Sequence, residues 1–102
     1  MDKVRENGKV AVLISTGFGA GWYTWIQDET VLFDPEIVEM VREGKSPKEI
    51  EEVAAKKWPS AYLGGVDGLV IEWIPEGAQF EVDEYDGAES LHIIGDRTYI
   101  TT

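Results

Sequence analysis

The chain has 102 residues, which is enough for one domain and too few for two. Its residues are 43% apolar and include four Trp, four Tyr and three Phe, a composition that supports one compact core and argues against disorder. Twenty Asp and Glu against nine Lys and Arg give a net charge of −11, which argues against direct binding of nucleic acid or of a membrane surface. Because the chain has no cysteine, disulfides, thiolate zinc sites, iron–sulfur clusters and a cysteine nucleophile are excluded.

The sequence shows neither the pattern of a signal peptide nor that of a membrane-spanning segment. The apolar stretch at residues 10–14 is too short for a signal peptide, and no A-x-A cleavage motif follows it. No apolar run approaches the roughly 20 residues that cross a bilayer as a helix. We therefore expect a cytoplasmic protein, with residues 1–102 forming a single domain.

The first half of the chain predicts one strand followed by two helices. Residues 9–15 are a continuous β-branched run, which is typical of a central strand covered on both faces. Residues 16–33 lack a regular period and leave room for a short strand at 31–33. Asp34-Pro35 and Ser46-Pro47 each combine an N-cap residue with a proline in the first helical turn, and they predict helices over residues 35–43 and 47–57.

From Leu69 onward the apolar residues follow a period of two, which is typical of strands. Asp86-Gly87 is the strongest hairpin signal in the chain. The predicted strands cover residues 69–74, 80–85, 91–94 and 98–101. The sequence therefore predicts an α+β fold: a strand, two short helices packed on one face of the sheet, and then a mainly antiparallel β-meander.

The most unusual segment is residues 16–25, which we call the glycine loop. It carries three glycines within five residues and four aromatic side chains, so its backbone can approach a ligand closely and its rings can stack on a planar group. It does not match the dinucleotide-binding fingerprint, because Trp22 stands where the third glycine of G-x-G-x-x-G would be and no helix follows directly. The candidate ligand-binding residues in this segment are Thr16, Gly17, Phe18, Gly19, Gly21, Trp22, Thr24 and Trp25.

Two interpretations of the glycine loop stay open. Its aromatic residues either fill the core or a subunit contact, or they form one wall of a small-molecule pocket. The length of the loop supports the second interpretation without deciding between the two, because loops this long are usually functional or disordered and the aromatic residues argue against disorder. In the second interpretation Trp22 or Trp25 stacks on a planar ligand group, and the backbone near Gly19 approaches the ligand closely.

A cluster of carboxylates follows in the last third of the chain, and residues 68–102 hold eight carboxylates against a single cation, Arg97. The cluster reads as a solvated strand face, as a source of hydrogen-bond acceptors for a ligand, or as a metal site, although it lacks the spacing of a calcium loop. We expect Asp83 and Asp86 to be the polar partners of a ligand, because their strand precedes the hairpin turn. The full cluster is Glu81, Asp83, Glu84, Asp86 and Glu89.

No convincing catalytic set is present. His92 is the single histidine, and none of the serines lies in a nucleophile-elbow context. We therefore expect a protein that is not an enzyme and that needs no metal or cofactor.

Long stretches of the sequence resemble small proteins encoded by tailed bacteriophages. The resemblance covers nearly the whole chain from Val10, and its most specific parts are GFGAGWYTW at residues 17–25 and EYDG at residues 84–87. It implies a setting in the cytoplasm of an infected bacterium, where small accessory proteins often counter host defence. It assigns no activity to named residues.

Two functions of different classes follow from these observations. The first is a non-catalytic module that binds a small nucleotide-like ligand and sequesters a host immune signal. The alternative is an acidic inhibitor that occupies a basic, nucleic-acid-binding site on a host defence protein. We also expect a homodimer or higher oligomer, because eleven aromatic residues are many for so small a core to hide.

Overall fold

The apolar run at residues 9–15 forms the central strand of the fold. The computed structural model describes residues 3–17, 21–23, 29–59, 64–85, 88–94 and 100–101. Strand β2 (Lys9–Ser15) pairs antiparallel with β1 (Arg5–Glu6) on one side and with β3 (Leu69–Pro75) on the other, giving sheet A in the order β1-β2-β3. Every residue of β2 after Lys9 is buried, which confirms the prediction of a strand covered on both faces.

A second antiparallel sheet, sheet B, packs across the other face of β2. It has the strand order β5 (Ala88–Ile94), β4 (Gln79–Tyr85) and β6 (Ile100–Thr101). The β4–β5 hairpin is present as expected, since Tyr85 pairs with Ala88 across the turn. The sequence predicted one meandering sheet, whereas the chain reverses after β3 and places the following strands in a second sheet, whose strand β5 contacts β2. The reason is burial: β2 has a second apolar face, formed by Val10, Val12 and Ile14, that the two predicted helices do not cover.

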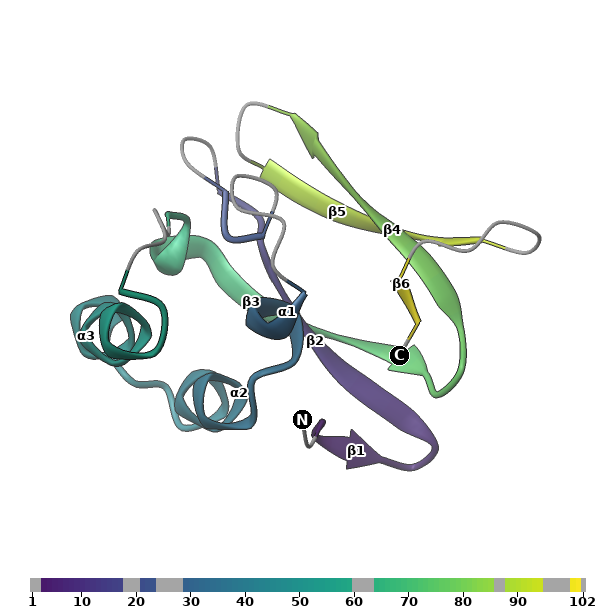
Figure 1. Cartoon of the computed structure of the whole chain (residues 1–102), viewed down its shortest axis with the longest axis horizontal. Helices are drawn as coiled ribbons and strands as arrows, with labels where there is room; N and C mark the ends of the chain where they lie inside the picture. The colour runs from purple at the N-terminus through teal and green to yellow at the C-terminus, as the bar shows by residue number, and fades with distance from the viewer. Residues whose placement is uncertain are drawn as a thin grey trace.

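The two predicted helices are confirmed as α2 (Pro35–Arg42) and α3 (Pro47–Lys57), and both lie on the face of sheet A opposite sheet B (Figure 1). Their N-caps form as the sequence predicts. The Asp34 carboxylate accepts a hydrogen bond from the Ile37 N–H at 3.1 Å, and the Ser46 hydroxyl accepts one from the Glu49 N–H at 3.3 Å.

The expected short strand at residues 31–33 is wrong, because this segment forms a one-turn helix, α1 (Thr30–Phe33). Its three apolar side chains are all buried, and they point into different parts of the core: Val31 joins the residues under the helices, whereas Leu32 joins those under sheet B. A short apolar run that is buried on all sides carries no period, so the sequence could not distinguish helix from strand here.

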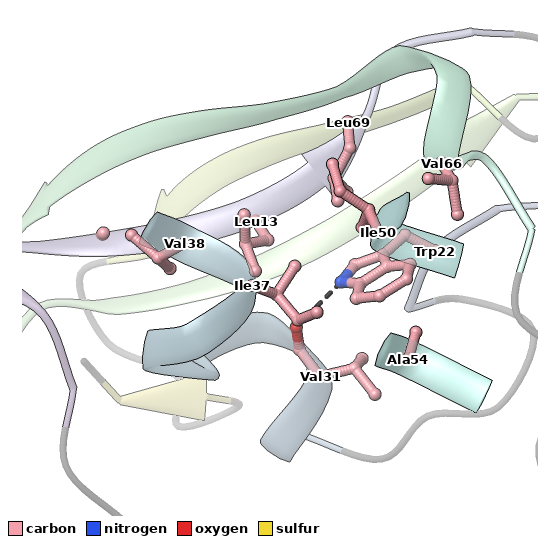
Figure 2. Close-up of a cluster of buried hydrophobic side chains, with 10 residues drawn as sticks. Leu13, Trp22, Val31, Ile37, Val38, Ile50, Ala54, Val66 and Leu69 are labelled. Carbon is pink, nitrogen blue, oxygen red and sulfur yellow. Dashed lines mark hydrogen bonds between the residues drawn. The ribbon is translucent and has the colours of Figure 1, made fainter. Parts of the chain in front are cut away.

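The core has two parts, one on each face of β2. The helix-side cluster is shown in Figure 2 and is built around Leu13, Trp22 and Ile37. The sheet-side cluster contains Val12, Ile14 and other apolar residues beneath Phe80 of β4. A short 3-10 turn, η1 (Val66–Gly68), leads into β3 and adds Val66 to the helix-side cluster. Among the described residues no helix is long and apolar enough to cross a membrane.

Candidate functional site

The buried carboxylate of Glu89 connects the backbone on the two sides of the three glycines. Glu89 lies on β5 and is only 3% exposed. Its Oε1 accepts a hydrogen bond from the Ser15 backbone N–H at 2.8 Å, and its Oε2 accepts one from the Tyr23 backbone N–H at 2.8 Å. Ser15 and Tyr23 lie on either side of the three glycines, so the Glu89 side chain fixes the distance between these two residues. Hydrogen bonds from backbone N–H groups to an ionised carboxylate are among the stronger ones in proteins.

We call residues 15–17 and 21–23 the loop base, and two backbone hydrogen bonds attach it to the segment before β3. The Thr16 N–H donates to the Gly68 carbonyl oxygen at 3.0 Å, and the Gly64 N–H donates to the Gly21 carbonyl oxygen at 3.3 Å. Gly68 lies so close that a Cβ atom there would be 2.7 Å from the backbone nitrogen of Gly17. Only glycine fits at this contact.

The hydroxyl of Ser15 is a buried polar group of the loop base for which the described residues supply no partner. Ser15 has no exposed surface, and among the described residues its Oγ has no hydrogen-bond partner. A Cβ atom on Gly68 would be 3.5 Å from this Oγ, so the hydroxyl lies beside the contact between the loop base and η1. Buried polar groups in proteins are nearly always paired, and an exception requires an explanation.

Trp22 lies in the hydrophobic core and does not line an open ligand pocket. Its side chain has no exposed surface, and its Nε1–H donates to the Val31 carbonyl oxygen at 2.8 Å (Figure 2). Its ring meets the ring of Trp58 edge to face at a centroid distance of 6.0 Å. In this structure the ring therefore offers no free face on which a ligand could stack. For Trp22, the structure favours the first of the two interpretations of the glycine loop.

Tyr23 lies between the two parts of the core and is partly buried. Burial raises the pKa of its phenol above 10.0, and the nearby carboxylates of Glu29 and Glu89 raise this pKa further. The phenol is therefore uncharged at neutral pH. Tyr23 therefore adds no charge to the loop base.

The structure brings together only part of the predicted site. Thr16, Gly17, Gly21 and Trp22 meet at the loop base, whereas Asp83 does not. Asp83 is exposed and pairs in register with Ser90, so it lies on the opposite face of sheet B from Glu89, which pairs with Glu84. The remaining predicted site residues lie outside the described residues; they are Phe18, Gly19, Thr24, Trp25 and Asp86.

Glu89 is the residue whose role the sequence reasoning missed, because it was grouped with a solvated acidic cluster. A signal for it was present. Along β5, Glu89 has the same parity as Leu91, which packs against the sheet-side cluster, and a period of two places both side chains on the inward face. An acidic residue on the apolar face of a strand predicts a buried carboxylate that needs partners.

A second, smaller feature is a surface hollow of about 250 Å³ at the far end of sheet A, lined by Glu6, Asn7, Lys9 and Trp73. Two of its four lining side chains, Glu6 and Trp73, already contact Arg42. Arg42 forms an ion pair with Glu6, and its guanidinium lies over the Trp73 ring at 5.7 Å. This hollow is therefore a weaker candidate for a ligand site than the loop base.

Four cations make contacts elsewhere in the fold. Arg5 pairs with Glu76, Arg42 with Glu6, Lys57 with Glu36, and Lys3 lies over the ring of Phe33. None of these contacts involves the loop base. Among the described residues no group of three or more His, Asp or Glu side chains is arranged to hold a metal ion.

In comparisons with known proteins, no protein-family model, curated protein or solved structure matches the chain.

Proposed function

We propose that this protein is a non-catalytic binding module whose loop base takes a small nucleotide-like ligand. The observation that carries the proposal is the hydroxyl of Ser15, which is fully buried and has no hydrogen-bond partner among the described residues. A buried hydroxyl without a partner costs about 1–3 kcal/mol, and a bound ligand that supplies the partner would recover this cost. A hydroxyl both donates and accepts, so it suits a ribose hydroxyl, a ring nitrogen or an exocyclic amine.

The arrangement around Ser15 supports binding in a further way. Glu89 accepts hydrogen bonds from the backbone on both sides of the glycines, so Ser15 and Tyr23 are already held in place before a ligand arrives. Preorganisation of this kind increases affinity because less conformational entropy is lost on binding.

The charge of the chain limits the kind of ligand. The cations Arg5, Arg42 and Lys57 are engaged with carboxylates away from the loop base. Phosphate groups would therefore be held by backbone N–H groups of the glycine loop, as in other anion-binding loops. In a phage-infected cell, such a protein would sequester a nucleotide signal of the host immune system.

The proposal is tested by thermal denaturation with a panel of nucleotides that includes cyclic dinucleotides and cyclic ADP-ribose variants. A ligand at 100 times its Kd stabilises the folded state by roughly 2.7 kcal/mol. We expect one member of the panel to raise Tm for the natural chain and for Ser90→Ala, which removes an exposed hydroxyl, and to have no effect on Ser15→Ala. If no member raises Tm, or if Ser15→Ala responds like Ser90→Ala, the proposal is wrong.

The alternative, an acidic inhibitor of a basic host defence protein, is favoured by a separate observation. Asp67 and Glu72 are exposed and have no ion-pair partner among the described residues. The chain has only nine Lys and Arg against twenty Asp and Glu, so its surface carries an excess of negative charge. Such a protein would ignore the nucleotide panel and would bind a basic protein with an affinity that falls as salt increases.

A further inference from the structure

Strand β3 forms an open edge of sheet A, and the hydrogen-bond register shows which of its backbone groups face outward. β3 pairs with β2 on one side and is the last strand of the sheet on the other. The Thr16 N–H donates to the Gly68 carbonyl oxygen, and the Glu76 N–H donates to the Gly8 carbonyl oxygen. In an antiparallel pair these bonds recur at every second residue, so the even-numbered residues of β3 bond to β2.

The odd-numbered residues of β3 therefore direct their N–H and C=O groups away from β2. Two of these residues have no free N–H: the Leu69 N–H donates a hydrogen bond to the Val66 carbonyl oxygen, and Pro75 has no N–H. This leaves Ile71 and Trp73 with outward backbone groups that have no partner among the described residues. Such a row is a ready template for another strand.

The side chains along this edge are apolar and acidic. Val70 is 37% exposed and is the one large apolar side chain among the described residues that reaches this level of exposure. Glu72, on the same face of β3, is exposed, and Asp67 is exposed just before the strand. Neither carboxylate has an ion-pair partner in the described part of the chain. The edge therefore presents a negative charge on either side of one exposed apolar side chain.

We propose that the outer edge of β3 binds an extended, basic segment of a partner protein, which adds to sheet A as a further strand. Backbone hydrogen bonds to Ile71 and Trp73 would supply the pairing, and the side chains of Val70 and Glu72 would select the sequence. Because Val70 and Glu72 are two residues apart on one face, the segment carries an apolar residue and a Lys or Arg two positions apart. This surface uses other residues than the loop base, so it does not depend on the ligand proposed above.

A second copy of this chain fits the edge less well. If two β3 strands paired antiparallel about Glu72, the two Glu72 carboxylates would lie directly opposite each other, and like charges in that position are destabilising. Each copy would also bring a net charge of −11 to the contact. Glu72 thus acts against self-pairing while it favours a basic strand.

The test uses hydrogen exchange followed by NMR with the full chain and a synthetic peptide, Thr-Lys-Thr-Val-Thr-Lys-Thr, in which a lysine lies two positions from the valine on either side. We expect the peptide to slow exchange of the Ile71 and Trp73 amides by about fivefold or more and to leave the Val70 and Glu72 amides unchanged, because these already bond to β2. An alternating pattern of this kind distinguishes strand addition from general stabilisation.

Matched controls make the charge requirement explicit. The peptide with Glu in place of both lysines should give no protection. Glu72→Lys should abolish the effect, whereas Glu52→Lys, which changes the same charge at an exposed position of α3, should leave it intact. The proposal is overturned if the lysine peptide protects neither Ile71 nor Trp73, if the glutamate peptide works equally well, or if both amides become protected without peptide as protein concentration rises. That last result would make a second copy the occupant.

Discussion

The loop base and the outer edge of β3 both contain polar groups without a partner, but the two regions differ in their contact with water. The Ser15 hydroxyl is fully buried, so its unmade hydrogen bond has a cost. The outward N–H groups of Ile71 and Trp73 belong to the edge strand of a sheet, where water can serve as their partner. The buried hydroxyl therefore requires an explanation, for which we propose a ligand, whereas the open edge supports a partner only together with the negative charge and the exposed Val70.

The largest difference in stability between the two regions should appear when their tryptophans, Trp22 and Trp73, are replaced. Trp22→Ala removes a fully buried side chain and its hydrogen bond to Val31, and we expect a loss of about 3–5 kcal/mol in the free energy of unfolding. Trp73→Ala, at the partly buried edge, should cost clearly less. Urea denaturation followed by circular dichroism measures both variants. Equal losses would contradict the assignment of Trp22 to the core.

The two glutamates give the next contrast. Glu89→Ala leaves the N–H groups of Ser15 and Tyr23 without their acceptor, and we expect a loss on the order of 3 kcal/mol. Glu72→Ala removes an exposed carboxylate without an ion pair in the described part of the chain and should change stability by less than about 0.5 kcal/mol. The same denaturation experiment serves here. A Glu89→Ala variant as stable as the natural chain would show that this carboxylate does not hold the loop.

A smaller effect should separate two glycines of the loop contact. In Gly68→Ala the added methyl group would lie 2.7 Å from the Gly17 backbone nitrogen, and we expect a loss of roughly 1–3 kcal/mol. Gly17→Ala should be tolerated better, because a Cβ atom there meets no atom within 4 Å. Thermal denaturation of both variants checks the order. A larger loss of stability for Gly17→Ala than for Gly68→Ala would contradict the close approach of Gly68 to the Gly17 backbone.

The smallest effect concerns alkaline pH. Burial raises the pKa of Tyr23 above 10.0, and the hydrogen bond to Glu36 raises that of Lys57 above 10.5, so the folded state holds both protons more tightly than the unfolded state. This stability is fully present below about pH 10 and is lost as pH rises through the folded values. We expect Tm to fall above pH 10, and to fall less in Tyr23→Phe. An identical fall in that variant would exclude Tyr23 as a contributor.

Much of the fold could be predicted from the sequence because local chemistry determines it. Asp34-Pro35 and Ser46-Pro47 carry their own N-caps, and the apolar run at residues 9–15 identifies a strand buried on both faces. The separation into two sheets could not be predicted, because the alternation along residues 80–85 does not say which strand lies beneath it. That choice depends on the second apolar face of β2, which is a long-range property.

The sequence drew attention to the glycine loop but did not indicate which residues its base contacts. The glycines of the loop mark the place where Gly17 and Gly68 approach each other. The sequence assigned the ligand's polar contacts to Asp83 and Asp86. The structure places Glu89 at the loop base and Asp83 on the opposite face of sheet B, and Asp86 lies outside the described residues. The unpaired hydroxyl of Ser15 could not be seen in the sequence, because burial and the absence of a partner are properties of the folded chain.

The most direct test of the account is the unfolding free energy of Ser15→Ala without any ligand. If the Ser15 hydroxyl has no partner in the protein alone, its removal should leave stability unchanged or increase it by up to about 3 kcal/mol, while Ser90→Ala serves as the exposed reference. A loss of more than about 1 kcal/mol would show that the hydroxyl already has a partner in the folded chain, and the reason for proposing a ligand at the loop base would disappear.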